Sequence, residues 1–207
     1  MANGAPAWTD GAAKAARAYF SGFASREACA QAWGAWEELQ AAVAAFLDAR
    51  ALAALSGVDV YGRLVALFES RPRMRARFKG LLCFQDGERL KQALLRLVTA
   101  REAGDEGRRI EAMGLGGLGR ATASELLCLW RPYRFLPQNT ATCAAVAALT
   151  GVYKKRDIEE FPYDAFLDLA GTFEGAFRAE AERVFPELRE PLRARRFLYF
   201  YAFLSEK

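Results

Sequence analysis

Four glycines just before a predicted helix form the most chemically informative feature of this chain. They fall within six residues, too many for a helix interior: Gly114, Gly116, Gly117 and Gly119. A glycine turn that opens a helix presents backbone N–H groups with no side chain in front of them, and the helix dipole adds partial positive charge. The pattern predicts a site for an anion such as phosphate. A tight turn between two helices is the alternative interpretation.

The composition lacks histidine, the side chain on which many enzymes rely for acid–base chemistry. The 207 residues contain no histidine, which excludes Ser-His-Asp and Cys-His nucleophiles, histidine-ligated zinc and histidine pH switches. The cysteines lie far apart and among apolar residues: Cys29, Cys83, Cys128 and Cys143. This spacing is unlike that of a zinc ribbon, a redox dithiol or a cluster-binding loop, so we expect them to pack in the core.

Helices must position whatever site the glycines form. Apolar residues recur at three- and four-residue spacing, which predicts a helix over 25–55 that Ser56-Gly57 ends, and apolar stripes within 61–68 and 90–98. Alternating strand patterns are nearly absent, so we predict an all-α fold. A dinucleotide-binding loop is excluded because no strand precedes the glycines.

A further helix is expected after Pro191 and is rich in aromatic residues. Its apolar residues are Phe197, Leu198, Phe200, Tyr201 and Phe203. We expect them to lie in the core. The alternative is a docking face for a partner or a following domain.

The charge balance is slightly basic and no membrane segment is predicted. Lys and Arg outnumber Asp and Glu by 29 to 25, and basic residues gather within 71–79 and 154–156. These runs are either solvated faces or phosphate-contacting patches. The N-terminus lacks a signal-peptide pattern, and the apolar run 41–47 is too short to cross a bilayer. We therefore expect a soluble, cytoplasmic protein.

The segment Gly117-Leu118-Gly119-Arg120-Ala121-Thr122-Ala123 resembles the hairpin of the helix-hairpin-helix DNA glycosylase superfamily. That hairpin typically reads Pro-Gly-(Val/Ile)-Gly-Arg-Lys-Thr-Ala. The similarity covers residues 110–146. It implies one all-α domain over 1–207, a two-lobed helical bundle with a helix-hairpin-helix motif. Its parts would be an N-terminal lobe (1–104), the motif with the following helix (105–150) and C-terminal helices (151–207).

The chain departs from this family at its catalytic positions. Bifunctional members carry a lysine where this chain has Ala121, and Asn139 stands where the family places its catalytic aspartate. Ala141 replaces a common histidine, and the iron–sulfur cysteines of some members are absent. Because a neutral amide cannot replace a carboxylate electrostatically, the resemblance implies DNA binding without catalysis.

The resemblance also implies which residues bind. The DNA-binding residues would be Gly117, Leu118, Gly119, Arg120, Ala121, Thr122, Arg131 and Arg134. The N–H groups of Gly117, Gly119 and Thr122 would face a phosphate. A monovalent cation, K⁺ or Na⁺, would be held beneath the hairpin by backbone carbonyls, those of Met113, Leu115 and Leu118. No other cofactor is expected.

A base pocket would lie where the family's catalytic site stands. Its predicted residues are Trp130, Tyr133, Gln138 and Asn139. Gln138 and Asn139 would read a base edge, and Trp130 or Tyr133 would stack on a base. Two simpler interpretations remain open: the aromatic residues pack in the core, and Asn139 only caps the helix that follows it.

A second, weaker resemblance concerns the run from Pro132 to Thr140. It is similar to glycosylase-derived modules in restriction and defence proteins, including the N-terminal domains of modification-dependent, McrB-type GTPases. This resemblance implies double-stranded DNA, with or without a modified base, as partner. Because the chain has no Walker loop, an NTPase or nuclease would be a fused or separate subunit.

Two alternative functions belong to other classes. An atypical active glycosylase would need a displaced carboxylate, for which the candidates are Glu125, Asp157, Asp164 and Asp168. A helical protein-interaction module would instead dock a partner through the aromatic C-terminal helix.

Overall fold

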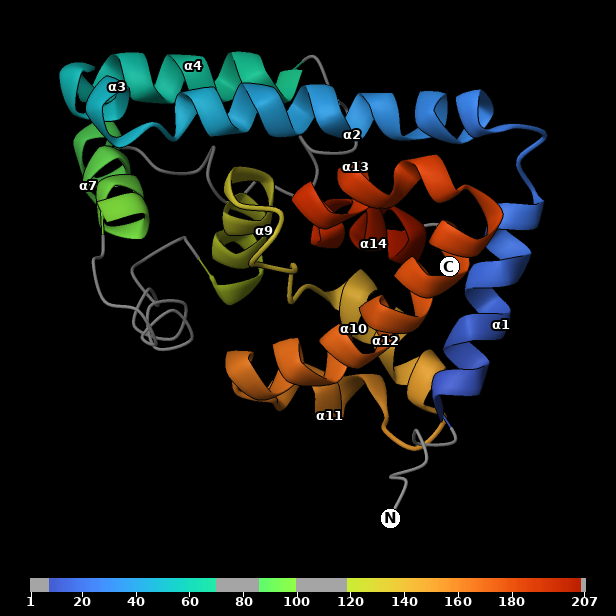
Figure 1. Ribbon diagram of the computed structural model, residues 1–207. Coiled ribbons are helices and arrows are strands. Elements are labelled where there is room, and N and C mark those ends of the chain that lie inside the picture. Colours follow the sequence, from blue (N-terminus) through green and yellow to red (C-terminus); the bar gives the residue numbers. More distant parts are fainter. Residues whose placement is uncertain (1–7, 70–85, 100–118, 206–207) are drawn as a thin grey trace.

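The computed structural model describes residues 8–69, 86–99 and 119–205, and in these ranges it contains helices and no strand (Figure 1). The predicted all-α class is confirmed there. The helices are α1 (Trp8–Ser21), α2 (Arg26–Phe46), α3 (Ala49–Ala54), α4 (Gly57–Glu69), α7 (Gly87–Thr99), α9 (Arg120–Trp130), α10 (Thr140–Thr150), α11 (Lys155–Glu160), α12 (Tyr163–Val184), α13 (Arg189–Ala194) and α14 (Arg196–Ser205), with a 3-10 turn at Pro186–Leu188.

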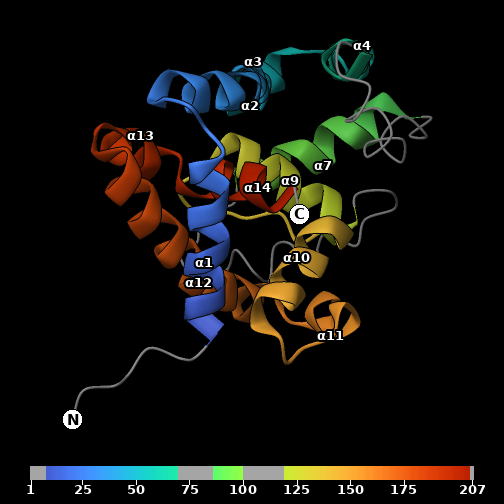
Figure 2. The ribbon, with the colours of Figure 1, turned by 90° about the vertical axis from the view of Figure 1, so that its right-hand side faces the viewer.

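Helix α14 lies at the centre of the arrangement. Figures 1 and 2 show α2, α3 and α4 along one side of the molecule and α10 and α11 on the other, with α9 and α14 between them. Helix α14 contacts α2, α9, α10 and α12. Because partners surround it, the whole segment 197–204 is buried, with each side chain at most 2% exposed.

The aromatic residues of α14 therefore belong to the core, as expected. Tyr199 stacks on Trp33 with ring centroids 4.2 Å apart, and Phe203 packs on Phe177 at 5.1 Å. Aromatic pairs at these separations add to the stability that burial provides. The docking interpretation of this face is wrong, and the interaction-module alternative loses the surface on which it was based.

The helix predicted over residues 25–55 is two helices. Helix α2 ends at Phe46, and α3 begins after Asp48, whose side chain accepts a hydrogen bond from the N–H of Ala51 at 2.8 Å. An aspartate in this position satisfies an otherwise unpaired N–H of the new first turn. The apolar pattern continues through the break, which is why the spacing alone predicted one helix.

Helices α4 and α7 begin against each other at two glycines. A Cβ atom added to Gly57 would lie 2.5 Å from the backbone nitrogen of Glu88, and one added to Gly87 would overlap the carbonyl oxygen of Gly57. Neither glycine has a positive φ. The requirement for glycine at both positions is therefore steric: two backbones approach too closely for any side chain.

Helix α1 packs against α12 and α10, although it lies far from both in the sequence. Arg17 on α1 donates a hydrogen bond to Glu180 on α12, with Nη2 and Oε1 2.7 Å apart. Arg183 also donates to the Glu180 carboxylate, at 2.8 Å. The start of the chain is thus joined directly to its C-terminal segment.

This ion pair should make stability depend on pH in the acid range. Hydrogen bonding from Arg17 lowers the pKa of Glu180 to about 2 from an ordinary 4.5. Its stabilisation is therefore complete above about pH 4.5 and is lost as the pH falls towards 2. We expect Glu180→Gln to lower Tm by roughly 2–3 °C at pH 7 and to match the wild type near pH 2. Thermal unfolding between pH 2 and pH 7 checks this prediction, with Glu187→Gln as the control. A Tm difference between Glu180→Gln and the wild type that does not change with pH would contradict it.

Candidate nucleic-acid interface

Helix α9 begins at a bare, exposed glycine. Gly119 is its N-cap residue, with φ −66° and ψ 163°, and no side chain caps the helix. A Cβ atom added to Gly119 would meet no described atom within 4 Å. The N–H groups of the first turn, including those of Ala121 and Thr122, have no partner inside a helix. Among the described residues, no side chain covers the positive end of α9 on the Gly119 side.

Several predicted residues of the hairpin lie outside the described residues. They are Met113, Leu115, Gly117 and Leu118. The proposed cation site, which depends on three of them, stays a prediction. The described part of the predicted motif is the stretch 119–123 and the helix that it opens.

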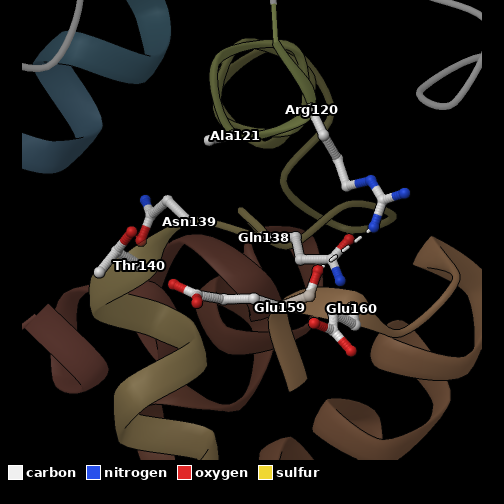
Figure 3. A pocket seen from close by; sticks show the side chains of 7 residues that line it. All are labelled: Arg120, Ala121, Gln138, Asn139, Thr140, Glu159 and Glu160. Atoms are coloured by element: carbon white, nitrogen blue, oxygen red, sulfur yellow. Dashed lines mark hydrogen bonds between the residues drawn. The ribbon is translucent and has the colours of Figure 1, made fainter. Parts of the chain in front are cut away.

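A cavity of about 530 Å³ lies beside this helix start (Figure 3). Its wall is formed by Arg120, Ala121, Gln138, Asn139, Thr140, Glu159 and Glu160. The first two residues open α9 and the next three lead into α10, so the N-termini of two helices border one cavity. Both dipoles favour negative charge there.

Arg120 forms part of this wall. Its Nη1 atom donates to the carbonyl oxygen of Phe161 at 2.9 Å and to that of Glu159 at 3.4 Å. Figure 3 shows its side chain reaching from α9 across to the end of α11. The guanidinium thus joins two helices at the cavity.

Gln138 is held firmly beneath the cavity. It is only 4% exposed, and its Nε2 atom donates to the carbonyl oxygens of Ile158 (3.1 Å) and Phe161 (3.0 Å). Its backbone N–H donates to the Ser124 hydroxyl at 2.9 Å. Its Oε1 atom has no hydrogen-bond partner in the described part of the chain. The amide is therefore fixed in orientation and leaves one acceptor at the cavity wall.

Asn139 caps α10, so the capping interpretation is confirmed. Its Oδ1 atom accepts from the N–H of Thr142 at 2.9 Å and from the Thr142 hydroxyl at 3.1 Å. Its Nδ2 atom donates to the Tyr201 hydroxyl at 3.2 Å, and that hydroxyl donates to Glu125 at 2.7 Å. Asn139 thus ends a chain of hydrogen bonds that leads through Tyr201 to the buried carboxylate of Glu125.

The four candidate displaced carboxylates all lie off this cavity. Glu125 is 3% exposed beneath Tyr201, Asp157 accepts from the N–H of Lys154 at the start of α11, and Asp164 and Asp168 are exposed on α12. The cavity instead has two carboxylates that the sequence did not indicate. Glu159 lies 3.6 Å from Lys155 and Glu160 lies 2.9 Å from Arg156. The i,i+4 spacing of these pairs indicates an exposed helix surface, but it does not indicate that this surface borders the cavity.

Tyr133 and Arg134 border a second, separate cavity of about 360 Å³. Its wall is formed by Tyr133, Arg134, Leu167, Asp168, Gly171, Arg196 and Phe197. The predicted base pocket is therefore divided: Gln138 and Asn139 lie at one cavity and Tyr133 at the other. Tyr133 is 51% exposed, so the core interpretation does not hold for it. Arg196 is a site residue that sequence reasoning missed.

Trp130 and Arg131 pack on each other at the end of α9. Trp130 is half-buried against the core, which supports the core interpretation of this residue. The Arg131 guanidinium carbon lies 3.9 Å from the centroid of the Trp130 ring, a cation–π contact. Arg131 is thus fixed in place beside the loop that leads to Arg134.

Three of the four cysteines are buried thiols, as expected. They are Cys29, Cys128 and Cys143, and Cys83 lies outside the described residues. Burial raises the pKa of Cys143 to about 12, and burial also raises the pKa of Cys128 well above its ordinary value. Both thiols stay protonated at neutral pH, so neither is a nucleophile.

No protein-family model, curated protein or solved structure matches this chain. Within the described ranges, no helix is both long and apolar enough to span a bilayer. The same residues contain no cluster of three acidic or cysteine side chains that could hold a metal ion.

Proposed function

We propose that this chain is a non-catalytic DNA-binding module of the helix-hairpin-helix, glycosylase-like type, with a two-lobed architecture. It would hold duplex DNA by a phosphate at the start of α9 and serve recognition of DNA, including modified DNA, in a restriction or defence system. One observation carries the proposal. Gly119 leaves the positive end of α9 bare beside a cavity that the N-terminus of α10 also borders.

Cations at both ends of α9 favour a polyanion that extends along the helix. Arg131 and Arg134 lie beyond its C-terminal end, on the loop to α10, and would contact phosphates away from the Gly119 site. The two cavity glutamates oppose an anion, but each lies beside a cation of α11, Lys155 or Arg156. Phosphate contacts of this kind give affinity and orientation rather than sequence specificity.

The absence of catalysis rests on side-chain chemistry. Asn139 uses its amide as a helix cap and a hydrogen-bond donor to Tyr201, and an amide cannot activate water as a general base. Ala121 provides no amine nucleophile. These substitutions support recognition without base excision.

An active glycosylase is the second candidate, for one reason. Glu125 is connected through Tyr201 to Asn139, which lines the cavity. Incubation with duplexes that carry damaged or methylated bases, followed by an assay for abasic sites, distinguishes this candidate. If the protein produces abasic sites and a Glu125→Gln variant does not, the chain is an active glycosylase and the first proposal is wrong.

Salt dependence tests the proposed binding. We expect micromolar or tighter binding of a duplex, with a slope of log K against log salt of roughly −3, since each neutralised phosphate contributes about −0.9. Arg131→Gln should reduce the slope by about 1. Arg50→Gln, an exposed arginine on α3, is the matched control. Fluorescence anisotropy measures both, on duplexes that differ only in base modification; no binding at low salt would overturn the proposal.

A further inference from the structure

We infer that the second cavity binds a nucleotide, either free or at the phosphorylated end of a nucleic-acid strand. Three segments distant in the sequence form it: the loop between α9 and α10, the first half of α12 and the start of α14. The inference does not depend on duplex binding at α9, because Gly119 and the first turn of that helix do not line this cavity.

Arg196 is held in place at this cavity before any ligand arrives. Its Nε atom lies 3.4 Å from the carboxylate of Glu174, and its guanidinium carbon lies 4.2 Å from the centroid of the Phe197 ring. Glu174 is 2% exposed, so the anchor is buried. An arginine fixed on two sides loses little conformational entropy when it binds an oxyanion.

The ion pairs that Glu174 forms leave one positive charge uncompensated. Glu174 is shared by two arginines, since the Nε atom of Arg178 lies 3.3 Å from its other oxygen. Two cations and one carboxylate leave a net charge of +1. Arg134 on the facing loop adds a second guanidinium to the cavity wall. A phosphate group, which accepts paired N–H donors, suits two guanidinium groups at one cavity.

The remaining wall residues favour a ligand that carries further groups besides a phosphate. Tyr133 is half exposed at the cavity, and no described aromatic ring contacts it, so its face can stack on a flat ring. Asp168 is acidic and therefore favours a ligand that also carries a hydrogen-bond donor, such as a sugar hydroxyl. Anion, flat ring and hydroxyl occur together in a nucleotide. A volume of about 360 Å³ lies within the range of small-molecule sites.

Gly171 provides a way to fill the cavity without removing a charge. A Cβ atom added there would lie 3.9 Å from Nη2 of Arg196, which is ordinary contact. Gly171→Leu therefore places an apolar side chain in the cavity, and leucine suits the interior of α12 better than glycine does. Ala179→Leu adds a leucine on the exposed surface of the same helix and is the matched control.

Isothermal titration calorimetry with deoxyadenosine 5′-monophosphate tests the inference on the full chain. We expect a Kd below about 1 mM, with deoxyadenosine and inorganic phosphate each at least roughly tenfold weaker, since each lacks one half of the contacts. Gly171→Leu and Arg134→Gln should each weaken binding at least roughly tenfold, while Ala179→Leu leaves it unchanged. Circular dichroism establishes that the variants are folded.

A second titration separates the two sources of the ligand. A 5′-phosphorylated dinucleotide that binds more tightly than the mononucleotide, and more tightly than its unphosphorylated form, identifies a strand end; the reverse order identifies a free nucleotide. Gly119→Asp should leave either affinity unchanged, which separates this site from the proposed duplex site. Equal affinity for nucleotide, nucleoside and phosphate, or an affinity that Gly171→Leu does not change, would overturn the inference.

Discussion

Replacing Gly119 by aspartate should weaken duplex DNA binding at least roughly 30-fold while leaving the protein at least as stable as before. An aspartate at this N-cap can accept hydrogen bonds from N–H groups of the first turn of α9, which have no partner inside the helix. Its charge also interacts favourably with the helix dipole, by about 0.3–1 kcal/mol. The same carboxylate occupies the donors proposed for a phosphate and repels that phosphate. Loss of one charge-assisted contact of this kind corresponds to roughly a 30-fold weaker affinity or more.

Two matched variants separate the contributions. Gly119→Asn caps the helix without adding charge, so the variant should lose the part of the affinity that depends on N–H groups of the first turn. Gly62→Asp makes the same change of charge on an exposed part of α4, where an added Cβ meets nothing within 4 Å, and should bind as the wild type does. Fluorescence anisotropy gives the affinities and thermal unfolding the stabilities. Wild-type affinity in Gly119→Asp would remove α9 from the proposed interface.

The second large effect is on stability, at the contact between α4 and α7. Gly87→Ala should lower the free energy of unfolding by about 3 kcal/mol, at the upper end of what overpacking costs. The new methyl group would overlap the backbone of Gly57, and backbone cannot move aside as the end of a flexible side chain can. The two helices must separate, which loosens the packing of the buried Leu90 and Leu94 on α7.

Gly62→Ala is the matched control and should act in the opposite direction. It lies on α4 with open space around it, so alanine should stabilise the protein by about 0.5–1 kcal/mol through helix propensity. Urea denaturation followed by circular dichroism measures both variants, with equal m-values as the sign of an unchanged native state. A Gly87→Ala variant as stable as the wild type would show that the two helices do not meet at their glycines.

Local signals in the sequence predicted much of the helical structure. The apolar stripe of α7 is buried as expected, because its i, i+3, i+4 spacing depends only on helix geometry. The cap at Asn139 was one of two interpretations that the sequence left open, and it is a local feature because Asn139 and its partner Thr142 are three positions apart. The break at Asp48 was missed because the apolar pattern on both sides of it continues without interruption.

The candidate site was predicted less completely because it is built by tertiary contacts. Arg196 reaches the second cavity only because the start of α14 packs on the loop after α9, where the N–H of Phe197 donates to the carbonyl oxygen of Pro132 at 2.9 Å. Glu159 reaches the first cavity because α11 ends beside the start of α9. No local pattern encodes either approach, so sequence spacing could not identify these residues.

The contact between α1 and α12 has a consequence during synthesis of the chain. Arg17 and Glu180 are 163 positions apart, so at about 5–20 residues per second α1 emerges from the ribosome roughly 8–30 s before its partner. During that interval the fully buried Phe20 of α1 can contact Trp33 of α2, but the part of its face that packs on Phe177 of α12 has no native partner. The nascent chain therefore exposes part of an apolar helix face for seconds, and packing of α1 is completed only after α12 has been synthesised.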